Sequence, residues 1–145
     1  VSMNVSQLLG DKGHEVISVE PQRTLADAVK VLAERRIGAV AVTGADGALV
    51  GILSERDIIR ALGQNGATAL ESPVSRVMTA KVVTCRPQTS VDELMEIMTS
   101  GRFRHVPVID NGRIAGIVSI GDVVKYRVAE IEAEGRAMRD YIAMA

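Results

Sequence analysis

The sequence predicts a mixed α/β protein of the α+β kind, built from a β-α-β-β-α unit that occurs twice. Two observations support this prediction. The heptapeptide GILSERD at residues 51–57 returns as GIVSIGD at residues 116–122, 65 positions further along. Upstream of it, Pro21 corresponds to Pro87 at a spacing of 66, and apolar residues follow each proline at helical intervals. Self-similarity at a fixed period indicates a tandem repeat.

The first unit contains strands and helices in that order. Thr24 is a suitable N-cap, and apolar residues at i, i+3, i+4 and i+7 from Leu25 predict a helix after it. Gly38 is expected to stop this helix, and a second helix is expected to begin near Asp57. The strands are expected at residues 16–19, 39–42 and 49–54, after a lead-in in which residues 10–13 predict a turn.

The second unit repeats this order. Ser90 is expected to cap a helix that Gly101 stops. Asn111-Gly112 lies between two runs rich in β-branched residues. This pattern predicts a hairpin with a type I′ turn, because that turn needs φ > 0 at both central residues. The strands of this unit are expected at residues 82–85, 105–109 and 114–119.

The boundary between the units is expected near residue 66. Residues 63–72 are polar, rich in glycine and alanine and without periodicity, so they predict a mobile linker, and residues 73–78 predict one helical turn. Residues 1–66 are assigned to the first repeat and residues 67–145 to the second. Because one unit of about 60 residues buries too little surface alone, we expect the two to pack sheet to sheet with pseudo-two-fold symmetry and clefts between them.

The last helix is expected to be long, from about Gly121 to Met144. Its apolar residues have near-heptad spacing and predict a seam for a partner surface. Gly135 lies on the same seam, where glycine costs about 1 kcal/mol relative to alanine, so a bend is expected there. The seam residues are Val124, Val128, Ile131, Met138 and Ile142.

The composition argues against several classes of protein. Lys and Arg number 17 and Asp and Glu number 18, so no basic excess favours nucleic acid or an anionic membrane. No apolar run approaches the roughly 20 residues of a membrane span, and the N-terminus lacks a signal-peptide pattern. A single cysteine, Cys85, fits a reducing cytoplasm and is expected to be a buried apolar side chain.

No catalytic constellation is present in the sequence. The two histidines, His14 and His105, lack the spacing of a zinc site. There is no P-loop and no G-x-G-x-x-G after a strand, and nothing orders Ser, His and Asp as a triad. We therefore expect a binding module rather than an enzyme, with no catalytic residue and no metal.

The two Ser-x-x-Asp segments, Ser54 to Asp57 and Ser119 to Asp122, mark the starts of helices. From the residues alone they are helix caps, which satisfy unpaired first-turn N–H groups. Such a start is also a place where anions and sugar hydroxyls bind. The arginines before the second hairpin permit two interpretations as well, a solvated charge cluster or a phosphate-binding group.

Two β-α-β-β-α units, each ending in G-h-h-S-x-x-D, with HVPV before the second and VMTAKVVTCRP opening it, resemble a tandem pair of cystathionine-β-synthase (CBS) domains, or Bateman module. The resemblance covers roughly residues 5–128 and points to the stand-alone bacterial type. It implies that AMP, ADP, ATP, NAD(H) or S-adenosylmethionine binds in the clefts between the repeats. It also implies a disc-like homodimer and regulation of an unidentified protein.

The resemblance assigns a main nucleotide site to the second repeat. Asp122 would accept the ribose hydroxyls, Ser119 would lie near the ribose or phosphate, and Arg104 and His105 would face the phosphates. The adenine would lie against residues of both repeats: Ile37, Gly38 and Ile117, with His14 nearby.

A second site follows by pseudo-symmetry around Asp57 and Ser54. It would also use Arg104. Because the first repeat has Gly38-Ala39 where the second has Arg104-His105, the Asp122 site is expected to bind more tightly. The remaining residues of the second site are Ile52, Phe103, Met78, Thr79, Lys81 and Val82.

The competing interpretation is a structural or interaction scaffold. In that case the clefts are vestigial and the C-terminal helix recruits a partner. A response of thermal stability to an adenosine ligand separates the two, because a ligand at 100 times its dissociation constant adds about 2.7 kcal/mol.

Overall fold

The computed structural model describes residues 3–12 and 16–144. Two β-α-β-β-α units are recognisable, as the sequence predicts, although the first strand of the second unit is reduced to a single bridge. The elements run α1 (Val5–Lys12), β1 (Ser18–Val19), α2 (Leu25–Arg35), β2 (Ala39–Thr43), β3 (Leu49–Ser54), α3 (Glu55–Asn65), the 3-10 helix η1 (Gly66–Glu71), α4 (Val74–Val77), α5 (Val91–Gly101), β4 (His105–Asp110), β5 (Arg113–Ser119) and α6 (Ile120–Met144).

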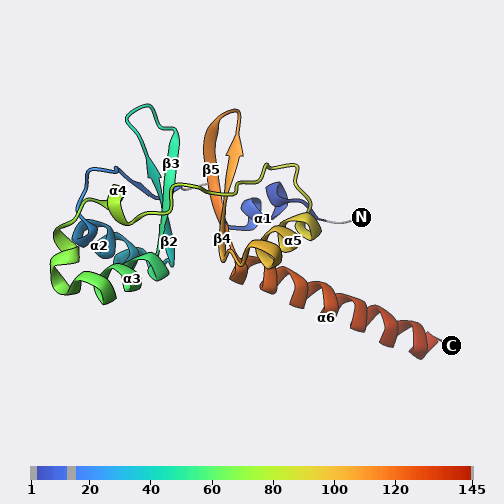
Figure 1. Cartoon of the computed structure of the whole chain (residues 1–145). Helices are drawn as coiled ribbons and strands as arrows, with labels where there is room; N and C mark the ends of the chain where they lie inside the picture. The colour runs from blue at the N-terminus through green and yellow to red at the C-terminus, as the bar shows by residue number, and fades with distance from the viewer. Residues whose placement is uncertain (1–2, 13–15, 145) are drawn as a thin grey trace.

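Each unit contributes one small sheet. In the first, β1 pairs parallel with β2, and β2 pairs antiparallel with β3. In the second, β4 and β5 form an antiparallel hairpin. The turn between them has Asn111 at φ 53° and Gly112 at φ 78°, so the predicted positive φ at both positions is confirmed. Figure 1 shows the two sheets between an outer layer of α2 and α3 and an outer layer of α1 and α5.

The two sheets face each other across the middle of the molecule. Strand β2 is buried at four successive residues, which an open sheet face would not allow. Val40 and Val42 belong to the core of the first repeat, whereas Ala39 and Ala41 are buried outside either core cluster. Pro107 of β4 is likewise fully buried outside both. The predicted sheet-to-sheet packing is therefore confirmed.

The strand expected at residues 82–85 is not formed, and Pro107 supplies the reason. Only Cys85 pairs with β4, with its N–H donating to Pro107 O at 3.0 Å. Extending a parallel ladder backwards would need an N–H donor at residue 107, which proline lacks. In the first repeat the equivalent residue is Ala41, and its N–H donates to Ile17 O at 3.3 Å.

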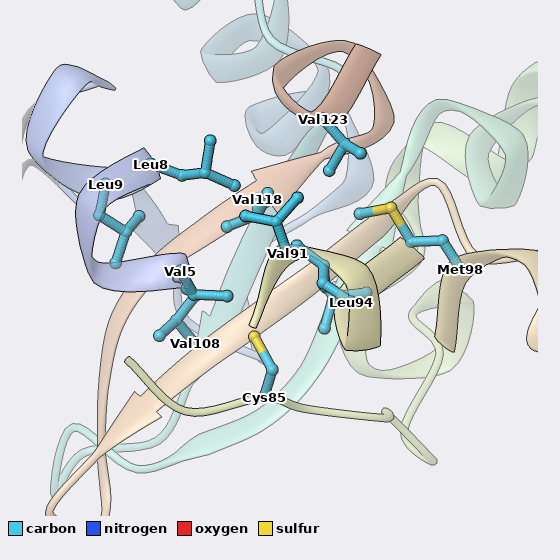
Figure 2. Close-up of a cluster of buried hydrophobic side chains, with 11 residues drawn as sticks. Val5, Leu8, Leu9, Cys85, Val91, Leu94, Met98, Val108, Val118 and Val123 are labelled. Atoms are coloured by element: carbon cyan, nitrogen blue, oxygen red, sulfur yellow. The ribbon is translucent and has the colours of Figure 1, made fainter. Parts of the chain in front are cut away.

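The leading helix of each repeat packs against the other repeat. Val5, Leu8 and Leu9 of α1 lie in the core of the second repeat with β4, β5 and α5 (Figure 2). Val74 of α4 is fully buried in the core of the first repeat. Helix α1 was not expected from the sequence. Its three apolar residues pack against the core of the second repeat, whose own residues begin at Cys85, far along the chain.

Residues 63–72, for which the sequence predicts a mobile linker, are mostly helical. Helix α3 continues to Asn65, and η1 follows directly. Ala69 is 1% exposed and lies in the core of the first repeat, which explains how a polar segment without periodicity is held. A 3-10 helix of six residues has only two turns and carries little amphipathic signal, so the sequence pattern alone misses it.

Arginines, not glycines, cap the ends of the two central helices. Helix α2 is capped by Arg36 and α5 by Arg102, both in the left-handed conformation, at φ 55° and 57°. The predicted stop at Gly38 is therefore two residues late. Gly101 is the last residue of α5, close to where it was expected. The predicted N-caps Thr24 and Ser90 are both confirmed.

Helix α6 projects away from the rest of the molecule (Figure 1). It is one continuous helix from Ile120 to Met144, which includes Gly135. Its ribbon in Figure 1 shows no sharp kink. Near its start Val123 packs into the core of the second repeat, and Tyr126 is partly buried against it. Most of the remaining helix is exposed.

Candidate functional site

The two Ser-x-x-Asp segments form the same hydrogen-bonded structure at the starts of α3 and α6. The Ser54 N–H and Oγ donate to Asp57 Oδ2 at 3.0 and 3.1 Å, and the Asp57 N–H donates back to Ser54 Oγ at 3.3 Å. In the second repeat, the Ser119 N–H and Oγ donate to Asp122 Oδ2 at 2.8 and 3.0 Å. Both segments are thus capping boxes, and the helix-cap interpretation is confirmed.

Asp57 also reaches a segment that leads into the second repeat. The Thr79 hydroxyl donates to Asp57 Oδ1 at 3.1 Å, and Arg60 lies 3.8 Å from the same oxygen. Thr79 is held there by backbone hydrogen bonds in both directions with Ile52, at 2.9 and 3.0 Å. Asp57 is only 4% exposed. Since each carboxylate oxygen has two lone pairs, Oδ1 retains capacity for a further donor.

A cleft of about 680 Å³ opens beside Asp57, between the two repeats. The starts of α3 and α6 both border it. The repeats come close together at its edge, where a Cβ added to Gly38 would lie 3.3 Å from Nε2 of His105. The cleft is lined by Gly38, Ile52, Ser54, Glu55, Arg56, Asp57, Ile59, Arg60, Thr79, Lys81, Val82, Val83, Gly101, Arg102, Phe103, Arg104, His105, Ser119, Ile120 and Gly121.

Most residues assigned to the second site line this one cleft, with Met78 as the exception. Of the residues assigned to the main site, Gly38, Arg104, His105 and Ser119 line the same cleft. Ile37, Ile117 and Asp122 do not line it, and His14 lies outside the described residues. The second-site residues in the cleft are Ile52, Ser54, Asp57, Phe103, Thr79, Lys81, Val82 and the shared Arg104.

Positive charge dominates the lining of the cleft. Its acidic residues are Glu55 and Asp57 alone. Five cationic side chains surround it, which favours an anionic ligand: Arg56, Arg60, Lys81, Arg102 and Arg104.

Unused backbone donors add to this positive potential. At the helix starts, the Glu55 and Ile120 N–H groups donate to Gly38 O and Arg104 O. The N–H groups of Arg56 and Gly121 have no protein acceptor within the part of the chain that the structure describes. Both residues line the cleft, and first-turn N–H groups bind phosphate well.

An apolar surface accompanies the charges. Ile59, Val83 and Ile120 line the cleft although they are 69%, 41% and 46% exposed. Together with Ile52 and Phe103 they offer a surface to a flat ring.

Sequence reasoning missed Arg56, Ile59 and Arg60. These residues share one face of α3 by their i, i+3 and i+4 spacing, which is the signal that would have found them.

The described residues contain neither a cluster of metal-ligand side chains nor a helix suited to a membrane. Among the side chains that the structure describes, at residues 3–10 and 16–144, no three His, Cys, Asp or Glu residues gather as a possible metal site. In that same portion, no helix combines the length and the apolar character that a membrane crossing requires.

The fold and the cleft define a duplicated α/β module with a ligand-sized opening where its halves meet. The family model of the CBS domain matches this chain twice, at residues 10–64 and 74–129. The chain therefore belongs to the CBS domain family, as a tandem pair. Proteins of this family are generally regulatory, non-catalytic modules.

Similar proteins cover most of this chain. The crystal structure of the CBS-domain-containing protein ATU1752 from Agrobacterium tumefaciens superposes on this chain with a TM-score of 0.84, and the two sequences are 50% identical. The match covers 88% of this chain and 95% of that one. The mitochondrial CBS domain-containing protein CBSX3 of Arabidopsis thaliana is 39% identical over 123 residues. That match covers 82% of this chain but only 60% of the plant protein.

Two similar solved structures contain adenosine compounds. The CBS domain pair of protein MJ0100, 26% identical with a TM-score of 0.81, is in complex with 5-methylthioadenosine and S-adenosyl-L-methionine, and the match covers 90% of this chain and 99% of that one. The CBS domain protein PAE2072 from Pyrobaculum aerophilum, 29% identical with a TM-score of 0.75, is complexed with AMP. That match covers 83% of this chain and 89% of the other.

Proposed function

We propose that this chain is a non-enzymatic regulatory module that binds an adenosine ligand carrying phosphate, in the cleft beside Asp57. The observation that supports this most directly is the makeup of the cleft. It combines a buried carboxylate, an apolar surface and five cations in one opening between the repeats. The AMP bound to PAE2072 supports this ligand class. The 5-methylthioadenosine and S-adenosyl-L-methionine bound to MJ0100 support the adenosine part of it but not the phosphate.

Each part of the ligand has a candidate partner. Asp57 Oδ1 and the Thr79 hydroxyl oxygen accept hydrogen bonds from the ribose hydroxyls. The base lies against Ile52 and neighbouring apolar side chains. The phosphates lie among the cationic side chains, near the N–H groups of Arg56 and Gly121. This charge favours AMP, ADP, ATP or NAD(H) over S-adenosylmethionine, whose sulfonium is positive.

The proposal reverses the ranking of the two sites made from the sequence, which placed the tighter site at Asp122. Asp122 does not line the described cleft, whereas Asp57 does. Ligand in a cleft bordered by both repeats would bias their relative orientation, provided that it binds the two orientations with different free energies. The regulated protein, the disc-like homodimer and the cytoplasmic location remain expectations from the sequence.

Calorimetric titration with AMP, ATP, NADH and S-adenosylmethionine tests the proposal. Asp57→Asn keeps an oxygen acceptor for the cap but removes the charge, and Asp122→Asn is the matched control in the other repeat. Because hydrogen bonds to a charged group contribute about 1.5–3 kcal/mol, we expect Asp57→Asn to weaken AMP or ATP binding by about 10- to 100-fold. Asp122→Asn should leave it almost unchanged.

Two results would contradict the proposal. Loss of binding in Asp122→Asn alone would restore the ranking made from the sequence. Failure of the wild-type protein to bind any of the four compounds would favour the scaffold interpretation, in which α6 rather than the cleft carries the function.

A further inference from the structure

The exposed seam of α6 has the alternating spacing of three and four residues that is typical of heptad positions a and d in a coiled coil. Its residues are separated by 4, 3, 4, 3 and 4 positions, which assigns Val124, Ile131 and Met138 to d and Val128, Gly135 and Ile142 to a. All the large members are about half exposed or more: Val124 54%, Val128 49%, Ile131 56%, Met138 60% and Ile142 64%.

The seam faces away from the rest of the molecule. Helix α6 packs into the core of the second repeat through Val123 and Tyr126, which occupy positions c and f. These positions lie on the side of a helix opposite to a and d. A second helix can therefore lie along the seam without displacing any packed residue. Figure 1 shows that the distal part of α6 lies clear of the other elements, and the CBS domain match ends at residue 129.

The charges beside the seam indicate which helix fits. In a parallel, in-register pair, each g residue meets the e residue five positions later on the other helix. Arg127 at g then meets Glu132 at e of the second copy, and Glu134 at g meets Arg139 at e of the second copy. Both pairs are of opposite charge, and by symmetry each occurs twice.

The antiparallel alternative is disfavoured by the same residues. With full overlap of the seam, e residues meet e residues and g residues meet g residues. Glu132 would then face Glu132 of the second helix, Glu134 would face Glu134, and Lys125 would face Arg139. All of these pairs are of like charge.

From this seam and its flanking charges we propose that α6 binds α6 of a second copy of this chain as a parallel, in-register coiled coil. Arg127 also pairs with Glu130 on its own helix. A guanidinium has five donors, so this pairing does not prevent the contact with Glu132 of the second copy. The interface involves none of the residues that line the cleft, so it is independent of the proposed ligand.

Sedimentation velocity on the full chain tests the proposal. Ile131→Asp places a charge in the seam, and we expect it to raise the dissociation constant of the α6 pair about tenfold or more. Ala133→Asp adds the same residue two positions away at f and should change nothing. A wild-type chain that is monomeric at about 100 μM, a mass unaffected by Ile131→Asp, or equal losses in both variants would each overturn the proposal.

A charge exchange tests the parallel register. Glu134→Arg alone and Arg139→Glu alone create like-charged pairs and should each weaken assembly severalfold, while the double variant restores opposite charges and should recover the wild-type association. Arginine and glutamate have similar helix propensity, so the helix itself is little affected. Weakening by both single variants without recovery in the double variant would overturn the parallel arrangement.

Discussion

At the scale of single residues, the glycines that open the two heptapeptides have different surroundings. A Cβ on Gly51 would lie 2.7 Å from the sulfur of Met78 and 2.9 Å from the backbone oxygen of Thr79. A Cβ on Gly116 would lie 2.7 Å from Cδ2 of Leu9, a side-chain end that can rotate. Each glycine thus allows the close approach of the segment that crosses its strand.

We expect Gly51→Ala to destabilise the protein more than Gly116→Ala. A backbone oxygen cannot move aside without breaking the hydrogen bonds between Ile52 and Thr79, so Gly51→Ala should cost about 3 kcal/mol and Gly116→Ala about 1 kcal/mol. Urea unfolding of both variants measures the difference. Equal losses would show that the segment at Thr79 is as easily displaced as the Leu9 side chain.

Cys85 gives a prediction for alkaline pH. It is 5% exposed, and burial raises the pKa of its thiol from 9 to about 11. Between these values the unfolded chain loses the proton while the folded chain keeps it. The contribution of Cys85 to stability is therefore complete below pH 9 and is lost as the pH rises toward 11.

Unfolding experiments at intervals from pH 8 to pH 11 measure this loss, and Cys85→Ala supplies the control. A hydrogen bond to Glu130 also raises the pKa of Tyr126, so only the difference between the two proteins isolates the thiol. We expect the wild-type curve to fall more steeply. Parallel curves would contradict the effect of burial on Cys85.

At the scale of elements, the C-terminal end of α2 has a strained backbone that a substitution can relieve. Arg36 has φ 55°, and a left-handed conformation costs a residue with a Cβ roughly 1–2 kcal/mol. Glycine relieves this strain but loses more conformational entropy on folding. We therefore expect Arg36→Gly to raise the free energy of unfolding by a net of about 1 kcal/mol. Arg36→Ala removes the same side chain but keeps the Cβ, so it should bring no gain. A gain of equal size would assign the effect to the charge instead.

Elements governed by nearby residues could be predicted from the sequence. The hairpin at Asn111-Gly112 and the caps at Thr24 and Ser90 depend on contacts within a few positions. Helix α1, η1 and the missing strand at residues 82–85 depend on distant partners. The decisive partner of residues 82–85 is Pro107, whose lack of an N–H matters only once the fold brings it opposite.

The candidate site divides in the same way. The helix starts at Asp57 and Asp122 follow from a repeated motif. The cationic face of α3, with Arg56 and Arg60, was missed because its role depends on which side of the helix the second repeat covers. The ranking of the two sites relied on Arg104-His105, but both residues line the cleft beside Asp57.

At the scale of the whole molecule, the two cores depend on each other, because α1 packs in the core of the second repeat and α4 in the core of the first. Val5 lies in the core of the second repeat and Val74 in the core of the first, both fully buried. Neither repeat has a complete core without a segment from the other. We therefore expect the two repeats to unfold as one cooperative unit.

Amide hydrogen exchange under native conditions tests this cooperativity. Val5→Ala should reduce the free energy of unfolding by about 2 kcal/mol. The protection of amides in both repeats should fall together, including Val40 in β2 and Val106 in β4. Val74→Ala is the reciprocal control and should act alike. Loss of protection at Val106 alone in Val5→Ala would show that the repeats unfold separately.

The capping boxes bear on how other sequences of this kind should be interpreted. Asp57 and Asp122 hold the starts of α3 and α6 whether or not anything occupies the cleft. Selection for folding alone would preserve both aspartates in a descendant that has abandoned its ligand. Retention of the motif is thus a marker of ancestry and architecture. Lys81, Arg102 and Arg104 belong to neither hydrophobic core. If the proposed function holds, their loss would be the earlier sign that a descendant no longer binds the ligand.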